Sequence, residues 1–157
     1  QANDNYRMKS TNKEIIKYDL GYYTVSFIQK MFTNIKLSKV KKINFMKKNF
    51  YKNISFKSKE VSGIIEWGVG FQYSNEISYF SDKIFISTER IFSKPSNYKP
   101  KINFIKNNNL KEIILKNENH FDKMFKLYIE IIKSKNYERY NYLKLNTINT
   151  LKLLYKT

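Results

Sequence analysis

The sequence predicts an α+β fold, in which an antiparallel sheet is covered by a C-terminal helix and preceded by an N-terminal helix and a basic extension. Apolar residues recur at helical spacing before residue 36, alternate with other residues from residue 61, and return to helical spacing after residue 119. Strands joined in hairpins and followed by a covering helix form a two-layer sandwich. The strands of this single sheet are expected near residues 61–73, 77–88, 101–106 and 110–116.

The first helix is predicted over about residues 13–36. Glycine lowers helix propensity, so Gly21 is expected to interrupt or loosen this helix. From Thr24 onward, the apolar residues follow the spacing of one helix face. These residues are Phe27, Ile28, Met31, Phe32 and Ile35.

The stretch SGIIEWGVGFQYS, residues 62–74, has the pattern of a long strand whose side chains alternate between two faces. Trp67 falls on the face with Ile65 and Val69 and is expected to point into the core. Of the four glycines in the chain, Gly63, Gly68 and Gly70 lie here. Glycine within a strand marks a bulge, a sharp coil or the close approach of another element. The alternative is the close approach of a nucleic-acid backbone.

A hairpin and a second helix complete the predicted fold. The stretches INFI and LKEIIL bracket KNNN, residues 106–109, which predicts a hairpin with asparagine in its turn. Asn119 has the character of a helix N-cap, and Asp122 follows in the first turn. A second amphipathic helix is therefore expected over about residues 120–135, packed on the sheet.

Composition narrows the classes of function. The 157 residues are enough for one domain with a proper core. The chain has no cysteine and one histidine, His120, which argues against a disulfide framework, a thiol nucleophile and a zinc site. No apolar run is long enough to span a membrane. With no phosphate-binding loop, dinucleotide fingerprint or nucleophile elbow in the sequence, no cofactor is expected.

The charge of the chain points to a polyanionic partner. Thirty basic side chains oppose thirteen acidic ones, which gives a net charge of +17. Aromatic residues are interleaved with lysines in the stretch from Lys36 to Lys59, as in arms that lie along RNA by charge and stacking. A solvated loop, enriched in lysine by an AT-rich genome, is the alternative. The candidate RNA-binding residues of this stretch are Lys41, Lys42, Lys47 and Lys48.

The carboxylates of the central strands are candidates for acid–base catalysis, because paired carboxylates can carry out such chemistry. In so basic a chain they are more simply ion-pair partners of lysines, so the sequence predicts that the protein is not an enzyme. These carboxylates are Glu66, Glu76, Asp82 and Glu89.

Four short stretches resemble the family of the sixth protein of the large ribosomal subunit. TVSFIQKM resembles that family's Thr-x-Ser-Leu-Ile-x-x-Met helix, and WGVGFQ resembles its Val-Gly-Val-Gly-Tyr-Arg strand. KEIILKNENHFDK is similar to its final strand and helix start, and IKSKNYERY to its Ile-Arg-Ser-x-x-x-Pro-Glu-Pro-Tyr. The chain departs from the family in its longer stretch between Met31 and Gly68, in Gln72 where the family has arginine, and in NYLKLN, which replaces a Lys-Gly-Lys-Gly loop.

The resemblance implies a structural constituent of the large subunit of an organellar, mitochondrial ribosome, located in the mitochondrial matrix and serving translation. Its partners would be large-subunit rRNA near the factor-binding region and neighbouring ribosomal proteins, with no small-molecule substrate. The alternative is a basic accessory subunit of a mitochondrial inner-membrane complex that contacts anionic lipid. By position in the family pattern, the further rRNA-binding residues are Lys133, Lys135, Arg139 and Tyr140.

The resemblance also implies a division of the chain into four segments. Residues 1–36 would be a helical remnant of the family's first domain, and residues 37–60 a basic insertion. Residues 61–140 would form the α+β RNA-binding domain, and residues 141–157 a C-terminal extension.

Overall fold

The computed structural model describes residues 13–38, 42–43, 50–95 and 97–156. The chain divides into two compact units. The first, called here the core unit, comprises Gln1–Phe71 and Tyr137–Thr157, and the second, the meander unit, comprises Gln72–Asn136. Helices and antiparallel sheets occur together, so the predicted α+β class is confirmed.

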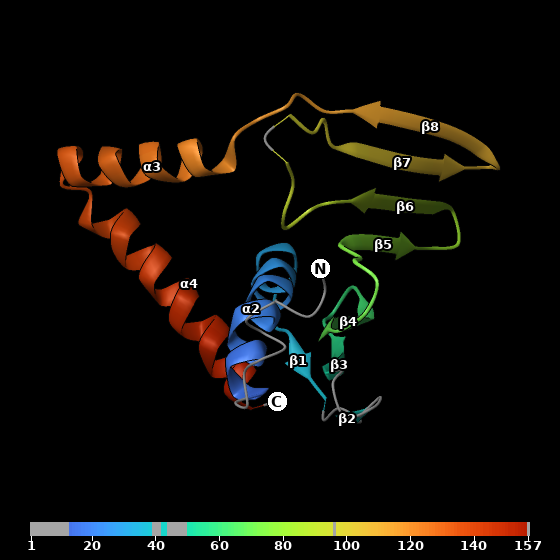
Figure 1. Ribbon diagram of the computed structural model, residues 1–157, viewed down its shortest axis with the longest axis horizontal. Coiled ribbons are helices and arrows are strands. Elements are labelled where there is room, and N and C mark those ends of the chain that lie inside the picture. The colour runs from blue at the N-terminus through green and yellow to red at the C-terminus, as the bar shows by residue number, and fades with distance from the viewer. Residues whose placement is uncertain (1–12, 39–41, 44–49, 96, 157) are drawn as a thin grey trace. The chain divides into compact units, whose positions relative to one another are not determined.

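The core unit is built on helix α2 (Lys13–Met31), which runs without interruption through Gly21 (Figure 1). A Cβ atom at Gly21 would lie 2.8 Å from Cζ2 of Trp67 and 3.1 Å from Cδ2 of Leu154. The glycine therefore allows two large side chains to pack directly against the helix backbone, and the expected loosening of the helix does not occur. The helix ends at Met31 rather than near residue 36, and Asn34 follows in the left-handed region with φ 52°.

A sheet of four strands packs on this helix. It consists of β1 (Lys36–Leu37), β2 (Lys42–Ile43), β3 (Phe50–Lys57) and β4 (Ser62–Val69). Strands β3 and β4 pair antiparallel along their whole length, while β1 and β2 pair with β3. The Ser58 hydroxyl closes the β3–β4 turn by accepting the backbone N–H groups of Glu60 and Val61 at 3.2 and 3.0 Å.

The core unit holds most of the buried apolar side chains. Trp67 is 6% exposed and points into this core, as predicted, and its indole N–H has no hydrogen-bond partner among the described residues. Strand β3 adds Ile54 and Phe56, so part of the lysine-rich stretch is a core strand and not a solvated arm. The other members of the cluster are Ile16, Val25, Ile28, Ile65, Val69 and Leu154.

The C-terminal helix α4 (Tyr137–Tyr155) belongs to the same unit and packs against α2. Its Leu154 is fully buried in the core, and the hydroxyl of its buried Thr150 lies 2.6 Å from Gln29 Oε1. The Tyr22 hydroxyl donates to Thr147 Oγ1 at 3.3 Å. The expected covering of the sheet by a C-terminal helix is thus met by α4, through Leu154.

The meander unit contains a second antiparallel sheet in the order β5-β6-β7-β8. Asn107 and Asn108, with φ 48° and 61°, form the two-residue turn between β7 and β8, because hairpin turns of this kind need positive φ and asparagine tolerates it. The hairpin predicted around KNNN is confirmed. The strands are β5 (Glu76–Phe80), β6 (Ile84–Glu89), β7 (Lys101–Lys106) and β8 (Asn109–Ile114).

Two sheets therefore replace the single sheet that the alternation predicted. Strand β4 ends at Val69, and Gly70 adopts φ 91°, a conformation that side-chain-bearing residues rarely take. The chain leaves the first sheet at this glycine and enters the second at Glu76. Gly70 thus has a backbone role, and no nucleic-acid contact is needed to explain it.

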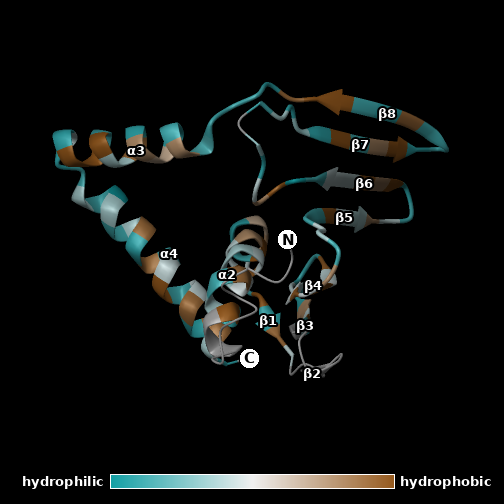
Figure 2. Ribbon diagram, in the orientation of Figure 1, coloured by the Kyte–Doolittle hydropathy of each residue, from teal (hydrophilic) through white to brown (hydrophobic). Residues whose placement is uncertain are grey.

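Helix α3 (His120–Ser134) is the predicted second amphipathic helix. The Asn119 side chain accepts the Phe121 N–H at 3.0 Å, and the Lys135 N–H caps the other end on the carbonyls of Ile131 and Ile132. The expected packing on the sheet is not found, because the helix does not lie along the β5–β8 strands. Figure 2 shows apolar and polar residues alternating along it. Its exposed large apolar residues are Phe121, Met124, Phe125, Tyr128, Ile129 and Ile132.

Candidate functional site

One end of the β5–β8 sheet gathers polar and aromatic side chains from four segments. Antiparallel pairing aligns the start of β5 with the end of β6, through Glu76 and Glu89, and the start of β7 with the end of β8, through Lys101 and Ile114. The segments flanking these strand ends, residues 73–75, 90–94, 98–100 and 115–116, therefore meet at this end of the sheet. Leu115 N–H donates to the Pro100 carbonyl at 2.8 Å, which ties two of them together.

Asn75 organises the loop after β6. Its carbonyl accepts the Arg90 N–H, and its side-chain oxygen accepts the Phe92 N–H at 3.1 Å. Its side-chain amide donates to the Tyr73 hydroxyl at 3.0 Å, and lies 3.4 Å from the Ser93 carbonyl. A short polar side chain that replaces backbone partners in this way is typical of asparagine in turns. Asn75 thus fixes both the backbone at residue 90 and the ring of Tyr73.

Arg90 is held in an uncommon backbone conformation beside two aromatic rings. Its φ of 52° lies in the left-handed region, which costs a residue with a side chain on the order of 1 kcal/mol. The carbon of its guanidinium lies 5.4 Å from the ring centre of Tyr73 and 5.7 Å from that of Tyr98, both within cation–π range. In the part of the chain that the structure describes, no carboxylate or hydrogen-bond acceptor is paired with this guanidinium.

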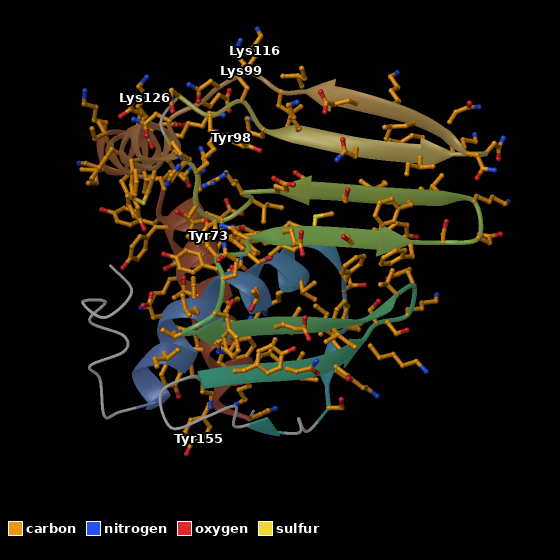
Figure 3. The ribbon with its side chains drawn as sticks, turned by 45° about the vertical axis from the view of Figure 1, so that its right-hand side comes forward. Tyr73, Tyr98, Lys99, Lys116, Lys126 and Tyr155 are labelled. Carbon is orange, nitrogen blue, oxygen red and sulfur yellow. The ribbon has the colours of Figure 1, made fainter. Side chains whose placement is uncertain are left out.

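Three lysines lie in the segments at this end of the sheet. Lys99 and Lys116 are exposed at the same end of the sheet, and Figure 3 shows them near Tyr98. The Lys123 ammonium pairs with Glu118 and holds the pKa of that carboxyl below its usual range, with further lowering by Lys94 and Lys116. We call Lys94, Lys99 and Lys116 the lysine rim. Two of its members, Lys94 and Lys116, thus both lower the pKa of Glu118.

A small pocket of about 230 Å³ opens next to Arg90. Two carboxylates, Glu76 and Glu89, line it from directly opposite positions of the β5–β6 ladder. Like charges at such positions repel one another. The remaining lining residues are Tyr73, Ser74, Asn75 and Arg90.

A larger pocket of about 480 Å³ lies in the core unit, where helices α2 and α4 end. It is lined by apolar and amide side chains, including Phe32, Gln29 and Asn149, and by Lys152 and Lys156. The carboxyl ends of helices carry partial negative charge, which lysines in the last turn offset. The helix ends therefore disfavour an anion in this pocket.

The sequence-predicted site residues are spread over the chain. Lys41, Lys47 and Lys48 lie outside the described residues, and Lys42 belongs to the short strand β2. Lys133 is in the last turn of α3 and Lys135 is its C-cap, both in the meander unit. Arg139 and Tyr140 are exposed in the first turns of α4, in the core unit. Their role in binding stays a prediction.

Of the candidate carboxylates, Glu76 and Glu89 lie opposite one another at the small pocket, whereas Glu66 and Asp82 lie elsewhere. Glu66 accepts hydrogen bonds from the Tyr51 hydroxyl and from Asn53 Nδ2, the latter at 2.8 Å. Asp82 is in the β5–β6 turn, remote in sequence from Glu66. Among the described residues, no group of three or more histidine and carboxylate side chains could hold a metal ion. No helix in that part of the chain is long and apolar enough to cross a membrane.

The α+β fold with these two antiparallel sheets is similar to part of a 3-ketoreductase of known structure. A lysine-to-alanine mutant of KijD10, a 3-ketoreductase from Actinomadura kijaniata in complex with TDP-benzene and NADP, aligns with a TM-score of 0.77 and 14% identity. The alignment covers 87% of this chain and 44% of that one. A lysine-to-glutamate mutant of the same enzyme aligns with a TM-score of 0.74 and 12% identity over 88% of this chain and 45% of that chain. This chain thus spans less than half the length of these enzymes.

No family model matches the sequence, and no curated protein matches it. The likeness is therefore one of fold. The matching structures are nevertheless of a ketoreductase bound to NADP and a TDP ligand. This finding contradicts the expected ribosomal role and the expected rRNA and ribosomal-protein partners. It also contradicts the expectations that the chain has no small-molecule substrate and is not an enzyme. The alternative of an inner-membrane accessory subunit falls with them.

The motifs behind the ribosomal expectation have structural roles in this fold. TVSFIQKM supplies Val25 and Ile28 to the core, and WGVGFQ supplies Trp67, Val69 and the turn at Gly70. Such requirements are shared by many folds, because any helix packed on a strand needs a small set of apolar and glycine positions. Short degenerate matches at these positions therefore do not specify a ribosomal protein.

Sequence reasoning missed the surroundings of Arg90. A signal was present, because arginine is rare in this lysine-rich chain and Arg90 lies two residues after a predicted strand. The loop that carries Tyr98 has no pattern of its own that marks it as part of a site. The proximity of these residues depends on the strand pairing, which no local pattern reveals.

Proposed function

We propose that this chain is the sheet-bearing part of an NADP-linked oxidoreductase that acts on a nucleotide-linked sugar. The observation that carries this proposal is the alignment of 87% of the chain to a 3-ketoreductase with a TM-score of 0.77. Because the aligned residues include parts of both units and not a single hairpin, the likeness supports a fold shared with the ketoreductase. The ketoreductase structures contain NADP and TDP-benzene, which supplies the ligand classes for this proposal.

The described residues are suited to the sugar-nucleotide side of such an enzyme and not to the dinucleotide side. Dinucleotide-binding folds place the pyrophosphate beside a parallel βαβ unit with a glycine-rich turn. All strand pairs in the described part of the chain are antiparallel. The NADP-binding part would therefore be formed by other residues, of this polypeptide or of another.

Helix α3 supports an association with further protein. Its apolar side chains Phe125 and Ile132 are 59% and 73% exposed, on a helix whose sequence is strongly amphipathic. Exposed contiguous apolar surface typically marks a protein interface. The proposal assigns this surface to the rest of the oxidoreductase.

The charge of the chain suits an anionic nucleotide. At +17 it attracts diphosphates without specificity, so a test must separate recognition of the nucleoside from simple charge attraction. Isothermal titration with thymidine diphosphate (TDP), NADP and inorganic pyrophosphate at about 0.15 M ionic strength, where the Debye length is about 8 Å, provides this separation. We expect TDP to bind more tightly than pyrophosphate. NADP should show no preference over pyrophosphate.

Equal affinities for TDP and pyrophosphate would contradict the proposed function, because the nucleoside would then contribute nothing. Tighter binding of NADP than of TDP would also contradict it, since the dinucleotide side would then be present in this chain. Repeating the titrations at higher salt checks that the TDP preference persists when exposed charges are screened.

A further inference from the structure

We propose that Arg90, flanked by Tyr73 and Tyr98, binds the diphosphate group of a nucleotide ligand. The identity of the nucleotide rests on the proposed function, whereas the diphosphate site is argued from the geometry of the described residues. The site is built from the loop ends of the β5–β8 sheet and lies wholly within the meander unit.

The guanidinium of Arg90 has the properties of a phosphate receptor. It is planar and carries five N–H donors that match the oxygens of a phosphate in a bidentate manner. Within the described structure its partners are Tyr73 and Tyr98, and both contacts are with aromatic rings. Because cation–π contacts use the charge of the guanidinium and not its N–H donors, no described residue occupies these donors, and we assign them to the ligand.

The site is also preorganised. The Arg90 backbone is held at φ 52° by its N–H bond to the Asn75 carbonyl, and the Asn75 amide donates to the Tyr73 hydroxyl. One asparagine thus positions both the arginine and one of its rings before any ligand arrives. Uncommon backbone conformations that are fixed by their surroundings often occur at ligand sites.

The lysines near the site favour an anion, and the glutamates beside Arg90 restrict the direction in which it can extend. Lys99 and Lys116 of the lysine rim flank the β7 start and the β8 end, and Lys94 lies in the β6–β7 loop and acts on Glu118. Glu76 and Glu89 line the small pocket. Neither glutamate forms an ion pair with Arg90 in the described structure. They repel an anion, so the diphosphate is expected to extend from Arg90 toward the lysine rim.

Tyr73 adds a surface for the base. Tyr73 is 58% exposed, and its hydroxyl accepts a hydrogen bond from the Asn75 amide. Bases stack on exposed aromatic rings in single-stranded nucleic-acid complexes, and the same contact is open to a nucleotide here. Arg90 would then bind the diphosphate and Tyr73 the base of one nucleotide ligand.

The test measures pyrophosphate and TDP affinity of the full chain and of substituted chains by isothermal titration. Arg90→Gln is expected to raise the Kd for pyrophosphate about tenfold or more, because it removes charge-assisted hydrogen bonds. Lys144→Gln, which removes an equal charge from an exposed position of α4 in the core unit, is the control and is expected to change the Kd less than about twofold. Glu76→Gln is expected to lower the Kd, because it removes a repelling charge.

Equal effects of Arg90→Gln and Lys144→Gln would overturn the inference, and so would weaker binding by Glu76→Gln. If Arg90→Gln does not fold, as judged by thermal unfolding, Arg90→Lys decides. This change keeps the charge but removes the planar fork, so an unchanged Kd would overturn the site and a several-fold rise would support it.

The same titrations separate this inference from the proposed function. A TDP preference that survives Arg90→Gln would leave the function standing and remove the site. Loss of pyrophosphate binding in Arg90→Gln, with no TDP preference in the unaltered chain, would leave the diphosphate site standing and remove the function.

Discussion

Substituting Gly21 by alanine tests the packing of the core unit. Alanine is normally the better helix residue by about 0.5–1 kcal/mol. Here the added Cβ would lie 2.8 Å from Cζ2 of Trp67, 3.0 Å from its Cε2 and 3.1 Å from Cδ2 of Leu154. Trp67 is 6% exposed and Leu154 is fully buried, so neither side chain has open space to move into.

The extra methyl therefore overpacks a filled core, which typically costs about 1–3 kcal/mol. The higher helix propensity of alanine offsets part of this cost. We therefore expect Gly21→Ala to lower the free energy of unfolding by about 1–2 kcal/mol. Urea denaturation followed by circular dichroism measures this change. In a double-mutant cycle, Trp67→Phe should reduce the penalty, because the smaller ring leaves room for the methyl and the indole N–H has no partner to lose among the described residues.

An increase in stability of about 0.5–1 kcal/mol in Gly21→Ala, the value for an unpacked helix position, would refute this reasoning. Additive effects of Gly21→Ala and Trp67→Phe would do the same, since they would show that the two residues are not in contact.

Two further predictions concern local structure. Asn119→Ala removes the N-cap of α3 and is expected to lower the free energy of unfolding of the unit that contains it by about 0.5–2 kcal/mol, measured by denaturation, with Asn119→Asp as the control that keeps the cap. Burial and a hydrogen bond to Glu66 raise the pKa of Tyr51 above its ordinary value, so the neutral phenol is favoured in the folded state. The stability that this provides is fully present below the ordinary value of about 10 and is lost as pH rises through the higher folded pKa. The stability difference between the unaltered chain and Tyr51→Phe should therefore shrink above about pH 10 in denaturation measurements, and a difference that grows with pH would contradict this sign.

The elements with purely local signals were predicted well. The Asn107–Asn108 turn and the Asn119 cap follow from side chains that act on their own backbone, and such patterns are readable without knowledge of the fold. Trp67 was placed correctly because strand alternation alone decides which side chains share a face.

The misplaced elements depended on distant partners. Strand β3 carries the core residues Ile54 and Phe56 inside a lysine-rich stretch, so charge concealed its alternation. Gly21 could be recognised as a packing position only once Trp67 and Leu154 were placed against it. The chain passes from one sheet to the other at Gly70. In the sequence alone, a strand glycine is equally compatible with a bulge, a sharp coil or the close approach of another element.

The candidate site was beyond sequence reasoning for a related reason. Arg90, Tyr73 and Tyr98 are brought together by the register of two strand pairs, β5–β6 and β6–β7, and each alone is an ordinary surface residue. The high lysine content favoured an anionic partner and directed the expectation to RNA. Fold likeness to a ketoreductase changed the proposed class of anion, from a nucleic acid to a nucleotide ligand.

The proposed role in an oxidoreductase acting on a nucleotide-linked sugar requires that this chain recognises the nucleoside part of TDP. Nuclear magnetic resonance of the isotope-labelled chain, titrated separately with TDP, pyrophosphate and NADP, tests it most directly. TDP is expected to shift the amide signals of Asn75, Arg90 and Tyr98 at lower concentrations than pyrophosphate or NADP does. Identical small shifts with all three ligands, spread over the lysines of the whole chain, would contradict it.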